Sequence, residues 1–236
     1  MGADLTEAEL PLGEYPSLGE FFARKLRDGA RPIDMTPGAI IAPCDGVIAA
    51  RGIATGGELV QVKGKTYLLD DLLVDHAFAA QLHGGEYMTI YLSPRDYHRV
   101  HTPVAAQLLG YDYVPGTLWP VNPRVAARVE RLLARNERVV IRLDAGKLGR
   151  VAFVMVGAAG VGNMRLTCDG MDSARLRGTQ EIHRTELTGH ALARGDELGA
   201  FRLGSTIVMV FEPGKATLAG EVGTAVRFGE RLGSAA

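Results

Sequence analysis

Residues 195–206 read GDELGAFRLGST and lead into the apolar run 207–211. The Gly-Asp turn, the alternating stretch and the apolar run predict two strands joined by a short connection. Because Gly204 has no side chain, the hydroxyl of Ser205 could turn back onto the carbonyl of its own preceding peptide bond. The stretch therefore has two interpretations: an ordinary Gly-Ser turn, or a serine that acts as a nucleophile on its own backbone.

Short strand patterns also dominate the rest of the chain. They cover residues 39–52, 59–63, 87–92, 107–114, 139–143, 151–156 and 161–167. Residues 169–190 are more polar and predict a loop region with a short strand. The chain has 30 glycines, which is typical of many turns between short strands.

Helical patterns are fewer and lie at the edges of the strand-rich regions. Ser17 and Glu20 form a capping box, and the helix that they begin is predicted to end at Gly29. Helical spacing also occurs at residues 68–82, with a break near Asp75, and at residues 124–134. We therefore predict an α+β, mainly β fold. It would be a single domain over residues 1–236, a sandwich or open barrel of short strands with a few peripheral helices and an N-terminal arm at residues 1–16.

The composition excludes several classes of protein. Of the 236 residues, 47% are hydrophobic and 22% are charged, as in a globular chain that buries a core. The formal net charge of −1 leaves no basic excess for a nucleic-acid partner. Cys44 and Cys168 match no metal-ligand spacing, so we expect reduced thiols. We expect neither a secretion signal nor a spanning segment, since the start of the chain is acidic and the longest apolar run is about half a bilayer span.

Five residues could carry chemistry, namely Asp45, Asp96, His98, His101 and Ser205. Asp45 lies in a Pro-x-Asp-Gly turn, where an aspartate often bonds only its own backbone. His98 and His101 could be structural, could belong to a metal site, or could handle protons near neutral pH. Zinc is disfavoured because no third ligand follows at a recognisable spacing. Aspartate, histidine and serine act together in any chain order, so their order here neither supports nor excludes a triad.

Several segments resemble the signature blocks of one family. They are LGST at 203–206, YHRVH at 97–101, YVPG at 113–116, FFAR at 21–24, PCDG at 43–46 and ARNER at 134–138. In sequence and order they are similar to blocks of the phosphatidylserine decarboxylases, the pyruvoyl-dependent enzymes of phosphatidylethanolamine synthesis. The resemblance extends over residues 15–214. It departs from the family at Cys44, where a small residue is usual.

The resemblance implies that the chain cuts itself. His101, oriented by Asp45, would take the proton of Ser205, whose oxygen would attack the carbonyl of Gly204 and convert the peptide into an ester. Elimination would then release a β chain of residues 1–204. After hydrolysis, residue 205 would remain as a pyruvoyl group at the start of an α chain of residues 205–236. Asp96 is a second candidate for the orienting carboxylate.

The resemblance also implies the reaction that follows. The pyruvoyl group would form a Schiff base with the serine amine of phosphatidylserine and accept the electrons left by departing CO2. It would take the role that pyridoxal phosphate has in other enzymes, with no metal. His98 would return a proton to the substrate.

Because the implied substrate is a membrane lipid, we expect peripheral association with the cytoplasmic face of the cell membrane. Phe78, Leu82 and the helix with Phe21 and Phe22 are candidates for contact with lipid, and equally for the core. A homodimer, and the preference for diacyl or archaeal ether lipids that would distinguish an archaetidylserine decarboxylase, are left open.

Three alternatives compete with this interpretation. The turn and strands at 189–201 are similar to those of carrier-like β-sandwich binding modules, although the chain has no lysine at a hairpin tip with the flanking residues of a carrier. Ser205 could instead serve a hydrolase of external esters. A structural relative that does not process itself is disfavoured, because Asp45, both histidines and the Gly-Ser pair are all present.

Overall fold

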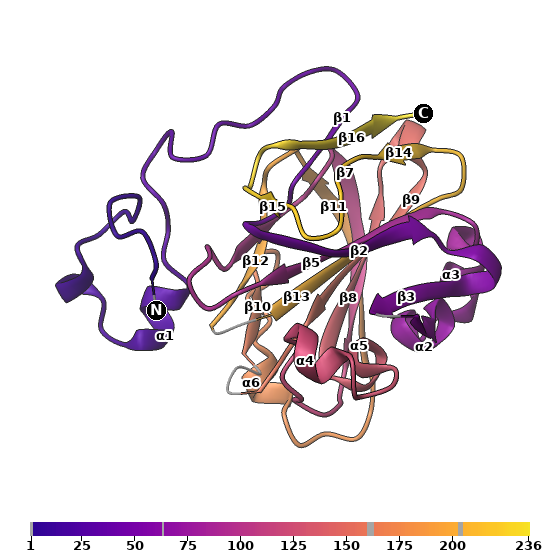
Figure 1. Cartoon of the computed structure of the whole chain (residues 1–236), viewed down its shortest axis with the longest axis horizontal. Helices are drawn as coiled ribbons and strands as arrows, with labels where there is room; N and C mark the ends of the chain where they lie inside the picture. The colour runs from indigo at the N-terminus through magenta and orange to yellow at the C-terminus, as the bar shows by residue number, and fades with distance from the viewer. Residues whose placement is uncertain (1, 63, 160–162, 203–204) are drawn as a thin grey trace.

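The computed structural model describes residues 2–62, 64–159, 163–202 and 205–236, and its largest element is an antiparallel sheet of eight strands (Figure 1). In spatial order these strands are β11 (His183–Leu192), β7 (Ala106–Val114), β8 (Arg138–Asp144), β9 (Arg150–Val156), β13 (Ser205–Phe211), β5 (Glu86–Leu92), β2 (Gly46–Ile53) and β15 (Ala225–Val226). The apolar run after Ser205 is therefore a central strand, paired with β9 on one side and β5 on the other.

Smaller antiparallel sheets hold the other named strands. One contains β1 (Ala39–Ile41), β16 (Arg231–Ala235) and β14 (Ala216–Leu218), a second contains β10 (Met164–Leu166), β12 (Glu197–Phe201) and β6 (Arg99–His101), and a third contains β3 (Glu58–Val62) and β4 (Lys65–Leu68). The Gly-Asp turn at the start of the 195–206 stretch thus leads into β12. The prediction of a mainly β fold with few helices is confirmed, and the described strands close no barrel.

The helices are short and peripheral. The α-helices are α1 (Leu18–Phe22), α2 (Leu69–Leu73), α3 (His76–Leu82), α4 (Pro123–Ala126), α5 (Leu132–Arg135) and α6 (Ser173–Leu176), and the 3-10 helices are η1 (Leu12–Glu14), η2 (Thr55–Gly57) and η3 (Gly146–Leu148). No helix in the described ranges has the length and apolar character needed to span a membrane.

Two cores lie on opposite faces of the large sheet. Along β13, Ile207 and Met209 belong to the core that also contains residues of the two three-stranded sheets. Val208 and Val210 belong to the core beneath α2 and α3. Because side chains alternate across a strand, a strand buried on both faces is apolar at nearly every position. Each of these buried side chains contributes about 1.5–3 kcal/mol to stability.

Three predicted segments differ from the structure. The predicted helix from Ser17 to Gly29 ends at Phe22, and the helical pattern at 124–134 is split by Arg131, whose backbone is left-handed with φ 53°. Where a loop region with a short strand is predicted at 169–190, residues 183–192 form the ten-residue edge strand β11. The break predicted near Asp75 is confirmed, since Asp75 caps α3 by accepting a hydrogen bond from the backbone N–H of Phe78.

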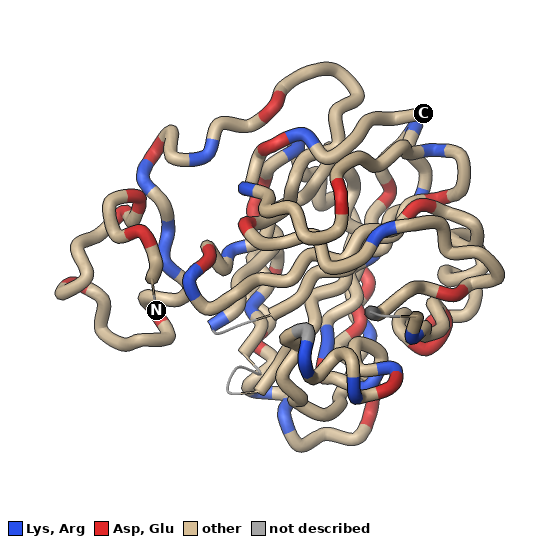
Figure 2. Tube along the Cα trace, in the orientation of Figure 1, with Lys and Arg blue, Asp and Glu red and all other residues tan. Residues whose placement is uncertain are grey.

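The N-terminal residues run along one side of the molecule before entering β1 (Figure 1). An isolated bridge between Ala8 and Leu26 and a hydrogen bond from Arg27 Nε to the carbonyl of Ala8 connect the two halves of this segment. Both basic and acidic residues occur along most of the chain (Figure 2). The segment before Arg24 is an exception, since its charged side chains are all acidic.

Candidate active site

Ser205 begins the central strand β13. It is fully buried, and its Oγ has no hydrogen-bond partner among the described residues. It lies opposite Leu92 at the end of β5, on the same face as Ile207. A buried hydroxyl without a partner is costly in an ordinary core, so Ser205 remains a candidate for chemistry. Gly204, the other half of the predicted cleavage site, lies outside the described residues.

His98 lies at the same end of the sheet as Ser205. Its Nε2–H donates to the carbonyl of Ser93 at 3.0 Å, and Ser93 follows the residue opposite Ser205. A carbonyl oxygen only accepts, so the proton is on Nε2 and the lone pair is on Nδ1, which has no partner among the described residues. Burial lowers the pKa of His98 to about 4. The ring is therefore neutral near pH 7, and its free nitrogen can accept a proton.

His101 is also buried but has both ring nitrogens engaged. Nδ1–H donates to the carbonyl of Gly195 at 2.9 Å, and the hydroxyl of Tyr97 donates to Nε2 at 3.0 Å. The ring of Phe228 stacks on the imidazole, with centroids 3.7 Å apart and planes 12° from parallel. Burial lowers the pKa of His101 to about 4. This histidine is held neutral, in one tautomer and in one plane.

Asp45 lies beside His101 but bonds other groups. Its carboxylate accepts hydrogen bonds from the guanidinium of Arg31, the shortest at 2.6 Å, and from the backbone N–H of Phe228 at 2.9 Å. Arg31 also pairs with Glu7 at 2.8 Å. Sequence reasoning expects Asp45 to orient His101, and in this structure the two residues are connected through Phe228. A cavity of about 290 Å³ borders Asp45 and Arg31.

Asp96, the second candidate orienter, closes the turn before His98. Its carboxylate accepts the backbone N–H of Ser93 at 2.7 Å and lies 3.8 Å from Arg95. These contacts are those of an aspartate that stabilises a turn. These contacts fix the turn that leads to His98. Among the described residues, the Asp96 carboxylate bonds neither histidine ring.

The segment after α1 supports His98, a role that sequence reasoning missed. The ring of Phe22 packs against the imidazole of His98, with centroids 5.2 Å apart. Arg24 donates to the carbonyls of Arg95 and Asp96, each at 3.2 Å. The Phe-Phe-Ala-Arg block was the available signal, but nothing in its sequence indicates that it contacts a histidine more than 70 positions later.

The candidates for lipid contact are in the core. Phe78 and Leu82 belong to the core beneath α2 and α3, with exposed fractions of 6% and 0%. Phe21 and Phe22 are buried as well. Of the two alternatives expected for these four side chains, contact with lipid is therefore wrong and burial in the protein is confirmed.

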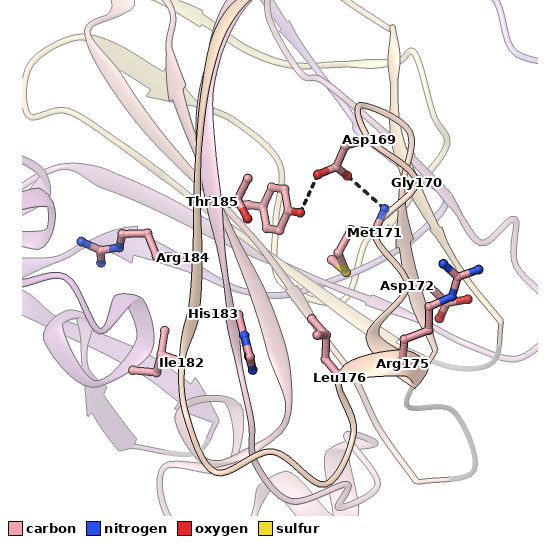
Figure 3. A pocket seen from close by; sticks show the side chains of 11 residues that line it. Asp169, Gly170, Met171, Asp172, Arg175, Leu176, Ile182, His183, Arg184 and Thr185 are labelled. Carbon is pink, nitrogen blue, oxygen red and sulfur yellow. Dashed lines mark hydrogen bonds between the residues drawn. The ribbon is translucent and has the colours of Figure 1, made fainter.

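Another groove among the described residues is lined by none of the five candidate residues. It measures about 530 Å³ and lies between β7, the start of β11 and the segment around α6 (Figure 3). The hydroxyl of Tyr111 donates to Asp169 at 2.6 Å, and Arg184 pairs with Asp112. These polar groups are paired, whereas Nε2 of His183, which also lines the groove, is buried without a hydrogen-bond partner among the described residues. No set of three His, Cys, Asp or Glu side chains in the described ranges is arranged as metal ligands would be.

Comparisons with known proteins identify the family of this chain. A family model described as phosphatidylserine decarboxylase matches residues 18–234. The chain is 44% identical to the phosphatidylserine decarboxylase proenzyme of Anaeromyxobacter sp. (strain K), covering 100% of this chain and 84% of that protein. It is 38% identical to the proenzyme of that name from Myxococcus xanthus, covering 98% and 82%, and 42% identical to the one from Ectopseudomonas mendocina, covering 98% and 83%.

Proposed function

Because the chain belongs to the phosphatidylserine decarboxylase family, we propose that it is a self-processing decarboxylase that converts phosphatidylserine to phosphatidylethanolamine and CO2. The observation that carries the proposal is Ser205, a buried serine at the start of a central strand whose hydroxyl has no hydrogen-bond partner among the described residues. Such a hydroxyl is available for nucleophilic attack.

The first step is self-cleavage before Ser205. The oxygen of Ser205 attacks the carbonyl carbon of Gly204, and the peptide bond becomes an ester as the amine leaves the carbonyl. Elimination then breaks the ester, giving a β chain of residues 1–204 that ends in a carboxylate and an α chain of residues 205–236 that begins with dehydroalanine. Water hydrolyses the dehydroalanine to a pyruvoyl group and releases ammonia. His101 is the base that we assign to this step, with Asp45 as its supporting carboxylate.

The pyruvoyl group that this cleavage forms is compatible with the residues around position 205. The position is fully buried, and His98, at the same end of the sheet, is neutral near pH 7 and has an Nδ1 without a partner among the described residues. A buried position has little access to water, and His98 is the proton-handling group that we assign to it. When formed, the group supplies an electron sink for loss of CO2 from the substrate. Residue 205 would carry it.

The two histidines have separate tasks in this proposal. His98 lies at the Ser205 end of the sheet, and its free Nδ1 can take up a proton and return it to the substrate. His101 has both nitrogens bonded and lies beside the Asp45 turn, whose Pro43 carbonyl accepts the backbone N–H of His101 at 2.8 Å. Their different partners support different roles.

Because the proposed substrate is a membrane lipid, we propose that the protein attaches peripherally to the cytoplasmic face of the cell membrane. Four leucines of the N-terminal segment support this, since Leu5, Leu10, Leu12 and Leu18 have exposed fractions between 40% and 53%. Exposed apolar side chains of this kind can enter the interfacial layer of a bilayer. They replace the buried phenylalanines as the candidates for lipid contact.

A denaturing gel with intact mass tests the proposal. Purified protein should contain two chains, 1–204 and 205–236, and the short chain should lack a free amine at its start. Ser205→Ala should remain a single chain. A decarboxylating protein that is still intact at Ser205 would refute the mechanism. Labelling of Ser205 by a fluorophosphonate would favour a serine hydrolase, and a lysine adduct on an intact chain would favour a carrier.

A further inference from the structure

We infer that Asp45 positions His101 through Phe228, a residue of the C-terminal segment, instead of bonding the imidazole itself. The inference rests on the proposed function, in which His101 is the base of self-cleavage. It makes Phe228 a positioning residue for that step. Three connections carry it: the carboxylate to the Phe228 backbone, the Phe228 ring to the imidazole, and the partners that fix the two ring nitrogens.

The first connection is a buried hydrogen bond. The backbone N–H of Phe228 donates to Asp45 Oδ1 at 2.9 Å, although the two residues are 183 positions apart in sequence. Neighbouring backbone bonds fix the same segment, since Gly229 N–H donates to Ala42 at 3.0 Å and Ala42 N–H donates to Glu230 at 2.7 Å. A buried N–H that loses its acceptor costs about 1–3 kcal/mol, so the carboxylate determines where this backbone lies.

The second connection is the stack between rings. Phe228 is 8% exposed and covers the imidazole of His101 at 3.7 Å between centroids. Tyr97 and Ile41 complete the small cluster around Phe228. A phenyl ring in this position prevents rotation of the imidazole and excludes water from one of its faces. Holding the Phe228 backbone therefore holds the plane of His101.

The third connection fixes the tautomer without a carboxylate. The Gly195 carbonyl accepts from Nδ1–H, which leaves the lone pair on Nε2. Gly195 has φ 89°, a backbone conformation that other residues rarely adopt, and a Cβ there would lie 2.6 Å from Ile33 Cδ1, so the Ile33 side chain would have to shift. The task usually given to the aspartate of a triad is thus performed here by a backbone carbonyl. What remains for Asp45 is the placement of Phe228.

Besides the Phe228 ring that covers the imidazole, three charged groups affect the pKa of His101. Arg99 lowers the pKa of His101, whereas Asp45 and Asp196 raise it, and burial has the largest effect. Removing the phenyl ring should reduce burial, so the pKa of His101 should rise toward its ordinary value. Removing only the charge of Asp45 should instead lower that pKa. The two changes have opposite signs, and a titration can separate them.

The test is an NMR titration of the His101 ring in full-length Ser205→Ala protein, which stays one chain and needs no turnover. In this background Phe228→Leu should raise the pKa of His101 by about one pH unit. Phe228→Tyr should leave it in place, because the ring remains. Phe211→Leu is the matched control, since Phe211 is a fully buried phenylalanine of the same C-terminal segment in another core.

Asp45 variants provide the second measurement. Asp45→Asn keeps an oxygen that can accept from Phe228 N–H, whereas Asp45→Ala removes it, and both remove the charge. We expect Asp45→Ala to raise the pKa of His101 relative to Asp45→Asn, and to slow self-cleavage about tenfold more in chains that retain Ser205. Equal pKa values for these two variants, or a Phe228→Leu shift no larger than that of Phe211→Leu, would overturn the inference. Failure of the parent chain to cleave would count against the proposed function alone.

Discussion

Lowering the pH from 7 to 5 should destabilise the folded chain through its two buried histidines. His98 and His101 have pKa values lowered by burial from 6.5 to about 4. In the unfolded chain both rings bind protons as the pH falls through 6.5, whereas in the folded chain they stay neutral until about pH 4. The unfolded state therefore binds more protons in this window, so stability falls as the pH falls. Below pH 4 this contribution levels off.

The size of the effect follows from the gap between the two pKa values. A gap from 6.5 to about 4 corresponds to about 3 kcal/mol for each histidine when fully expressed. Between pH 7 and pH 5 each should lose about 2 kcal/mol, or about 4 kcal/mol for the pair. A domain is typically stable by only about 5–15 kcal/mol, so this loss is large.

Urea denaturation followed by circular dichroism measures this loss. Ser205→Ala protein keeps the chain intact, so the two-state treatment applies to a single species. His98→Gln and His101→Gln, each added to this background, should reduce the loss between pH 7 and pH 5 by about 2 kcal/mol. His76→Gln is the control, because its ring is 85% exposed. If all four proteins lose stability equally, the two rings do not stay neutral in the folded state and the reasoning fails.

Three further predictions concern separate parts of the molecule. Arg138→Met should lower stability by about 3 kcal/mol or more in a thermal melt, because the buried guanidinium donates to four backbone carbonyls that would lose their partner; an unchanged melting temperature would contradict this. His98→Ala should still cleave yet lose decarboxylation by about 10²–10⁴-fold in a CO2-release assay; if it stays uncleaved while His101→Ala processes, the two roles are reversed. Leu12→Ser with Leu18→Ser should weaken cosedimentation with anionic vesicles and leave cleavage intact, since both side chains are exposed; unchanged cosedimentation would remove this segment from the membrane contact.

The strands that the sequence predicts best are those buried on both faces. Residues 207–211 and 151–156 are continuous apolar runs, and the structure places them side by side in the middle of the large sheet. The position and length of β11 were not predicted, for the opposite reason. It is an edge strand whose burial alternates between half-buried and exposed, so its residues are polar enough to be interpreted as a loop.

Helix ends were harder to predict than helix starts. The capping box at Ser17 is real, since its Oγ accepts from the backbone N–H of Glu20 at 3.2 Å. The end of α1 depends instead on tertiary contacts. Arg24 turns toward the carbonyls of residues 95 and 96, which are far away in sequence. A local sequence pattern can predict a helix cap, but it cannot predict a hydrogen-bond partner that lies about 70 positions away in the chain.

The same limit applies to the candidate site. Sequence could nominate Asp45, His98, His101 and Ser205, because each lies in a short block of recognisable composition. It could not give their partners. The acceptor for His101 is a backbone carbonyl, which carries no sequence signal, and the group between Asp45 and His101 is an aromatic ring from the opposite end of the chain.

The position of the proposed cut has a consequence for the cleaved protein. The segment from Ser205 onward contains β13, which is paired along its length with both β5 and β9, and all seven of its residues are buried. Farther along, β16 pairs with β1, and the backbone of Phe228 is bonded to Asp45. Breaking one peptide bond before Ser205 would leave all of these contacts in place. The α and β chains should therefore remain one folded unit without a covalent link. The new chain end would lie at the buried start of the central strand β13, at the end of the sheet where His98 lies.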